Sequence, residues 1–186
     1  MELTPTTKGV PCARAANASL IVRYILIISC QAPEFRSTFK FRFFSVRRNS
    51  GAIVKTMGDA IMATFSLPQE GVNAAVEMIN DMASLNAKLR AEDHELVLRI
   101  GLHEGSALAI NADDRLDCFG QAVNISARVQ GLAKSSEIWI TEPIFLASRV
   151  RDVFNASGFR ESEQSVILKV IREATTVYKM HRVVGE

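Results

Sequence analysis

The segment Gly51-Ala-Ile-Val-Lys-Thr-Met-Gly-Asp-Ala-Ile-Met-Ala-Thr-Phe65 contains two short apolar runs on either side of a Met-Gly-Asp turn. Runs of β-forming residues that flank a glycine predict a β-hairpin. Lys55 lies in the first run, four residues before Asp59 in the turn. The segment therefore predicts a hairpin that presents a lysine and a carboxylate near its tip.

A second informative segment is Leu116-Asp-Cys-Phe-Gly-Gln-Ala-Val-Asn-Ile-Ser-Ala-Arg128. Its apolar residues continue with helical spacing, so Asn124 and Arg128, four positions apart, are expected on one face of a helix. Asp117 lies just ahead of that helix, in an expected loop. The segment predicts an amide and a guanidinium side by side, with a carboxylate close to the start of the helix.

Further elements follow from hydrophobic periodicity and from turn residues. Strands and helices mix without a regular βαβ alternation, which predicts an α+β fold with a mostly antiparallel sheet flanked by helices. The expected elements are a strand at 20–30, a helix at 34–50, a helix at 72–89, a strand pair at 96–103 and 106–111 around Glu104-Gly105, a strand at 137–141, a short helix at 143–150, and a hairpin of 166–170 with 175–183.

Composition limits the classes of function. A chain of 186 residues with 48% hydrophobic content accommodates one core of ordinary size, and a net charge of +2 argues against nucleic acid as the partner. Three dispersed cysteines are typical of a reducing compartment, here the cytoplasm. The apolar run at 20–30 is interrupted by Arg23 and is much shorter than the ~20 residues of a membrane span. We expect an atypical, partly disordered segment at 1–33 and one domain at 34–186.

Four motifs, in this order, resemble the class III nucleotide cyclase homology domain, the catalytic domain of adenylyl and guanylyl cyclases. They are Lys-Thr-Met-Gly-Asp at 55–59, Arg-Ile-Gly-Leu-His-Glu-Gly at 99–105, Asp-Arg-Leu-Asp-Cys-Phe-Gly-Gln-Ala-Val-Asn-Ile-Ser-Ala-Arg at 114–128, and Leu-Lys-Val-Ile-Arg-Glu at 168–173. The resemblance extends from about residue 35 to residue 182. It implies cyclisation of a nucleoside triphosphate with release of pyrophosphate.

The resemblance also implies a base-reading pair. Adenine presents an amino donor beside a ring acceptor, so a site that prefers it needs one acceptor and one donor. Asp117 and Lys55 match the family residues with these roles, which implies that ATP is the substrate and cyclic AMP the product. Guanylyl members of the family typically carry Glu at the position of Lys55. Taken without the resemblance, Lys55 could also be a solvated strand residue.

The remaining roles concern the ribose and the phosphates. By resemblance, Asn124 orients the ribose, Arg128 stabilises charge on the α-phosphate, and Lys169 reaches the β- or γ-phosphate. Asp59 matches one of two aspartates that hold Mg²⁺ or Mn²⁺. Taken alone, Asp59 could also satisfy its own turn and Arg128 could lie along a solvated helix face.

The front of the chain departs from the family pattern. Relatives have a second metal-binding aspartate after the first strand, whereas no aspartate occurs here between Met1 and Gly58. Ser29, Cys30 and Gln31 stand where that acid is expected, and Glu34 is the nearby carboxylate. In the family, the two metal-binding aspartates and the base-reading pair of one site come from different subunits. The sequence therefore predicts an adenylate cyclase domain that works as a homodimer or heterodimer, or else a non-catalytic dimerisation or nucleotide-sensing partner.

Overall fold

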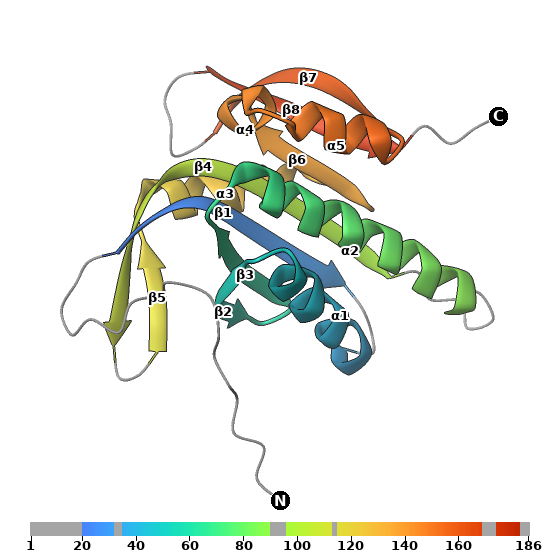
Figure 1. Ribbon diagram of the computed structural model, residues 1–186, viewed down its shortest axis with the longest axis horizontal. Helices are drawn as coiled ribbons and strands as arrows, with labels where there is room; N and C mark the ends of the chain where they lie inside the picture. Colours follow the sequence, from blue (N-terminus) through green and yellow to red (C-terminus); the bar gives the residue numbers. More distant parts are fainter. Residues whose placement is uncertain (1–19, 32–34, 90–95, 113–114, 169–173, 183–186) are drawn as a thin grey trace, which may run out of the picture.

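One eight-stranded sheet organises the domain (Figure 1). The computed structural model describes residues 20–31, 35–89, 96–112, 115–168 and 174–182. The strand order is β2-β3-β1-β4-β6-β8-β7, with β5 paired to β4, and every pair is antiparallel except β4 with β6. This confirms the predicted α+β fold. The strands are β1 (Leu20–Gln31), β2 (Ala52–Met57), β3 (Ala60–Phe65), β4 (Val97–Ala112), β5 (Arg115–Phe119), β6 (Glu137–Thr141), β7 (Phe159–Ile167) and β8 (Ala174–Arg182).

Helices cover both faces of the sheet, because alternate residues of the central strand β1 point to opposite sides. Leu26 and Ile28 pack in a large core with α1 (Phe35–Arg48), α2 (Pro68–Leu89), α4 (Glu142–Leu146) and α5 (Val150–Ala156). Ile25 and Ile27 face the other side, which α3 (Gln121–Leu132) covers. Figure 1 shows α1 and α2 lying across the near face. Within the described part of the chain, no helix has the length and apolar character of a membrane span.

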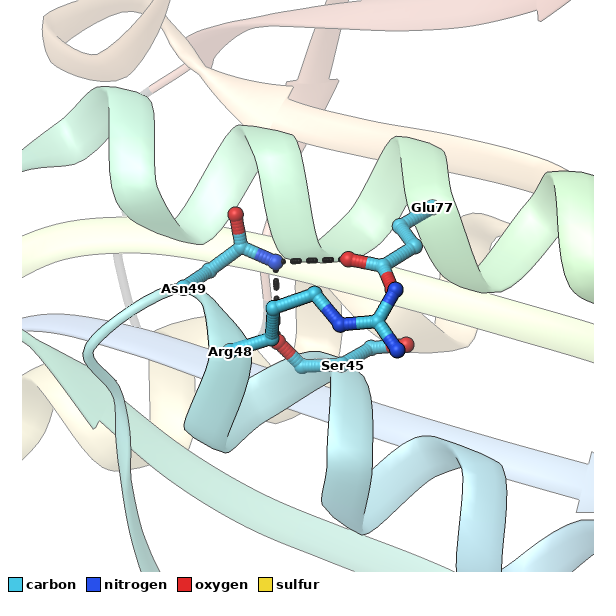
Figure 2. A network of polar contacts seen from close by, with 4 residues as sticks. All are labelled: Ser45, Arg48, Asn49 and Glu77. Atoms are coloured by element: carbon cyan, nitrogen blue, oxygen red, sulfur yellow. Dashed lines mark hydrogen bonds and ion pairs between the residues drawn. The ribbon is translucent and has the colours of Figure 1, made fainter.

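A polar network fixes the end of α1 against α2 (Figure 2). Arg48 Nη1 lies 2.7 Å from Glu77 Oε1, and Asn49 Nδ2 donates hydrogen bonds to Glu77 Oε2 at 2.8 Å and to the Ser45 carbonyl at 2.9 Å. The chain then turns through Ser50, which has a φ of 59°, and enters β2. The network therefore sets where the β2–β3 hairpin begins.

The expected strand pair around Glu104-Gly105 is wrong, because β4 runs without reversal from Val97 to Ala112. Its neighbour β1 pairs with residues on both sides of Gly105 and adjusts through a bulge between Val22 and Tyr24. A Cβ at Gly105 would lie 2.8 Å from the Ala122 Cβ. Glycine at this position therefore allows α3 to approach the sheet and does not make a turn.

Two other expectations need correction near the C-terminal end. The short helix expected at 143–150 is two helices, because α4 ends before the extended residue Ala147 and α5 begins only after Arg149, whose φ is 66°. The first strand of the expected terminal hairpin is β7, which begins earlier, at Phe159. Most of β7 is exposed at the sheet edge, so it lacks the apolar alternation by which strands are recognised. The strand at 20–30, the hairpin at 52–65 and the helices at 34–50 and 72–89 are confirmed to within a few residues.

Candidate functional site

Lys55 of β2 and Asp117 of β5 meet in an ion pair. The lysine Nζ lies 2.6 Å from Asp117 Oδ1, and the side chains are 33% and 29% exposed. A bulge between Ile53 and Lys55 shifts the β2–β3 register immediately before the lysine. Bulges re-aim side chains, which gives a physical reason for the direction of Lys55. Two residues from separate sequence motifs are thus brought into direct contact.

The expectation that Asp117 lies in a loop is wrong, because it lies within β5 and pairs with Ile110 of β4. The hydrogen bond from Lys55 holds the pKa of Asp117 below its ordinary value; partial burial opposes this, and the Cys118 N–H, 2.7 Å from Oδ1, adds to it. The aspartate is therefore ionised at neutral pH. An exposed ion pair contributes only about 0–1 kcal/mol to stability, so a ligand with complementary polar groups can replace it at low cost.

Phe119 belongs to the same surface, although the sequence reasoning did not single it out. Its side chain is 52% exposed, and Lys55 Nζ lies 5.8 Å from the centre of its ring. In β5, Phe119 is two residues after Asp117, so both side chains lie on one face of the strand. The sequence signal for Phe119 was its spacing of two residues from Asp117. That spacing places the two side chains on one face only if the segment is a strand, and the segment was expected to be a loop.

Helix α3 presents Asn124 and Arg128 to solvent, while Ile125, Ser126 and Val129 are buried. This confirms the predicted helix and the shared face of the two polar residues. The hydroxyl of Ser126 donates a hydrogen bond of 3.0 Å to the Ile25 carbonyl of β1. A side chain at Gly101 would overlap the backbone of Gln130, so glycine is required for this close packing. The positions of Asn124 and Arg128 are therefore fixed by contacts on the opposite side of α3.

Asp59 lies exposed at the tip of the β2–β3 hairpin, after Gly58, whose φ of 58° allows the tight turn. Its backbone carbonyl accepts a hydrogen bond of 2.7 Å from Arg42 Nη1 of α1. Across the sheet, Ser29 near the end of β1 pairs with Ala60, the residue after Asp59. The hairpin tip and the end of β1 are thus adjacent, as a shared metal site would require.

The residues present do not fit a site for two divalent ions. Ser29 Oγ accepts a hydrogen bond of 2.7 Å from Gln130 Nε2, and Cys30 is a buried thiol. Hard cations such as Mg²⁺ prefer several oxygen ligands with negative charge. Within the described ranges, no group of three or more His, Cys, Asp or Glu residues is arranged to hold a metal. Asp59 offers one carboxylate, and a buried arginine lies beneath it.

Lys169 and His103 belong to the two remaining sequence motifs. Lys169 lies outside the described residues, so its predicted contact with phosphate stays a prediction. His103 of β4 has its Nδ1 3.0 Å from Thr141 Oγ1, and burial lowers its pKa to about 4. Because it stays neutral at neutral pH and contacts Thr141 at the end of β6, His103 supports the packing of β4 against β6.

The fold of this chain is similar to solved structures of nucleotide cyclases. The fold is similar to the crystal structure of the adenylyl cyclase CyaB from P. aeruginosa, with a TM-score of 0.72 and 17% identity over 89% of this chain and 97% of that chain. It is also similar to an adenylate/guanylate cyclase/hydrolase from Silicibacter pomeroyi, with a TM-score of 0.71 and 18% identity over 87% of this chain and 98% of that one. At these identities the likeness shows the fold of a nucleotide cyclase domain.

The sequence itself shows the family. Residues 39–181 match the adenylate and guanylate cyclase catalytic domain, and the chain belongs to that family. A putative adenylate cyclase 3 of Rhizobium meliloti (strain 1021) is 30% identical over 115 residues, which are 61% of this chain and 19% of that protein. The chain therefore spans about a fifth of the length of this curated relative.

Proposed function

We propose that this domain is of the adenylate type and converts ATP to cyclic AMP and pyrophosphate at a site shared with a second cyclase domain. The observation that carries the proposal is the contact between Lys55 and Asp117. A donor and an acceptor held side by side match the adenine edge, with Asp117 accepting from the amino group and Lys55 donating to the ring nitrogen. In this proposal the chain supplies the base-reading and phosphate-stabilising half of the site.

The proposed chemistry requires positioning and neutralisation of charge. The ribose 3′-oxygen forms a bond to the α-phosphorus, loses its proton, and the bond from that phosphorus to the pyrophosphate oxygen breaks. Asn124 would hold the ribose so that this attack is in line. Arg128 would place its guanidinium fork on the α-phosphate oxygens, where charge increases in the transition state.

A second domain is part of the proposal because the relevant side chains are open to solvent. Leu108 and Phe119 pair across β4 and β5 on an exposed face of these two strands, and they are 41% and 52% exposed. Ile110 and Met57, 40% and 39% exposed, continue this apolar surface around the ion pair. Contact with another cyclase domain, either a second copy or a different chain, would bury these groups and exclude water from the base.

Product identity tests this function. The natural chain, mixed with a cyclase domain that carries both metal-binding aspartates, should convert ATP in preference to GTP when each is supplied with Mn²⁺. Cyclic AMP and cyclic GMP can be separated and quantified by chromatography. Equal turnover of the two triphosphates would contradict base reading by Lys55 and Asp117.

A non-catalytic partner or nucleotide sensor is the second candidate. It is favoured by the lone aspartate Asp59, because the family uses a second metal-binding aspartate after the first strand and this chain has none there. A domain of this kind would bind ATP and form a dimer without adding a working site to it. Formation of a stable heterodimer that binds ATP and makes no cyclic AMP would favour this candidate.

A further inference from the structure

Arg42 of α1 is an arginine buried completely in the core. Its exposed fraction is 0%, and it heads the largest fully buried side chains of the described residues. The adjacent helix positions Ser45 and Val46 are also 0% exposed, so this face of α1 packs tightly on the sheet. A guanidinium does not lose its proton in proteins, and a buried charge is costly unless other groups compensate it. A specific compensating environment is therefore expected.

That environment includes the hairpin tip and the end of β1. Arg42 Nη1 donates to the Asp59 carbonyl at 2.7 Å. Burial lowers the pKa of Arg42 from its ordinary value, and the Cys30 thiol and the Asp59 carboxylate act electrostatically in the opposite direction. The positive charge thus lies between the residue that follows the apolar part of β1 and the acid of the turn. This is the place where a family metal ion would bridge two aspartates.

We propose that the Arg42 guanidinium is the resident cation of this site, which holds the hairpin tip in place and keeps divalent ions away from Asp59. A hydrogen bond from a fixed side chain orients the tip without a metal ion. A positive charge beneath the tip repels a dication, and that repulsion acts through the protein interior, where it is screened less than in water. The inference deepens the proposed half-site role, because it gives a reason why the partner domain must supply the metal.

Metal binding by the full chain tests this directly and needs no turnover. Mn²⁺ titration followed by electron paramagnetic resonance counts free and bound ions in the natural chain and in four variants. These are Asp59→Asn, Cys30→Asp, Cys30→Asp with Arg42→Met, and Cys30→Asp with Arg48→Met. Arg48 is the matched control, because it is an arginine of the same helix that pairs with Glu77 on the surface and is 71% exposed.

The natural chain should show no Mn²⁺ binding that depends on Asp59. Cys30→Asp restores a second acid, which should pair with Arg42 and leave metal binding absent. Adding Arg42→Met should then raise Mn²⁺ affinity roughly tenfold or more, the scale of one unscreened charge repulsion. Adding Arg48→Met should have no such effect.

The inference is overturned if the natural chain or Cys30→Asp alone binds Mn²⁺ and Asp59→Asn abolishes that binding. It is also overturned if the folded Cys30→Asp, Arg42→Met variant binds no better than Cys30→Asp. Should Arg42→Met fail to fold, Cys30→Asp with Arg42→Lys keeps the charge and should still exclude Mn²⁺. Because none of these readouts uses ATP, failure here is distinct from failure of the proposed adenylate activity.

Discussion

Two regions of the chain, which would serve different sites of the proposed dimer, hold their charges in opposite ways. At the β2–β5 end, Lys55 and Asp117 form an ion pair whose members are about a third exposed. At the hairpin tip, the cation is the fully buried Arg42, bound to the Asp59 carbonyl. An exposed ion pair can exchange its partner for a ligand, whereas a buried guanidinium cannot leave. We infer that the first end is ready to receive a nucleotide base and that the second is closed to metal.

Removal of Arg128 should have the largest effect, and it should act on turnover. In any active assembly, Arg128→Ala should lower turnover roughly 10²-fold or more with little change in KM, because the lost interaction strengthens in the transition state. Steady-state cyclic AMP formation measures both constants. The helix should remain folded, since Arg128 is exposed and the buried face of α3 is untouched. Unchanged turnover would remove Arg128 from the mechanism.

Acid should weaken the contact between β4 and β6 through His103. The folded-state pKa is about 4 and the ordinary value is 6.5, so between these values the unfolded chain binds the proton and the folded chain does not. The free energy of unfolding should therefore fall as pH falls through this window, by up to about 3 kcal/mol. Urea unfolding of the natural chain and of His103→Gln at several pH values measures this. If the free energy of unfolding depended on pH equally in the two proteins, the lowered pKa of His103 would be contradicted.

Reversing the ion pair should change which base is preferred. Lys55→Glu combined with Asp117→Lys keeps an acid and a base in contact while it exchanges donor and acceptor. Discrimination in favour of ATP over GTP should weaken by on the order of 1–3 kcal/mol, the value of a good two-point base contact. Competition between the two triphosphates in the heterodimer gives this number directly. Retention of the full preference for ATP would show that other groups read the base.

The smallest effect should be on stability at the same end. Lys55→Met removes one member of an ion pair that is about a third exposed, so the free energy of unfolding should fall by no more than about 1 kcal/mol. Denaturant unfolding, with ATP preference measured in parallel, separates a binding role from a structural one. A loss several times larger would mean that the pair is structural and that this end is not ready to exchange it.

Local patterns in the sequence account for much of the fold. The hairpin around Gly58 and the helix with Asn124 and Arg128 follow from spacing that neighbouring residues satisfy among themselves. Gly105 is the exception, because glycine is needed there for the close approach of Ala122 from a later helix and not for a turn. Short-range periodicity contains no information on such a contact.

The candidate site shows the same limit. Lys55 and Asp117 were predicted as a pair through resemblance, and the structure places them in contact. Arg42 was not predicted, since an arginine in a helix with many basic residues is ordinarily solvated. Its burial depends on the hairpin tip and on the end of β1, which are brought to it only by the assembled sheet. Residues whose role depends on partners distant in the sequence were therefore the ones missed.

One measurement tests most directly whether this chain supplies the base-reading and phosphate-stabilising residues while a partner domain supplies the metal-binding aspartates. The natural chain is mixed with a family member that keeps both metal-binding aspartates and has alanine at the positions matching Asn124 and Arg128, and association is verified by sedimentation. Each protein alone should make almost no cyclic AMP, and the mixture should be active. Substituting Arg128→Ala in this chain should silence the mixture again. Strong activity of the unmixed natural chain, or an inactive heterodimer that demonstrably forms, would contradict the account.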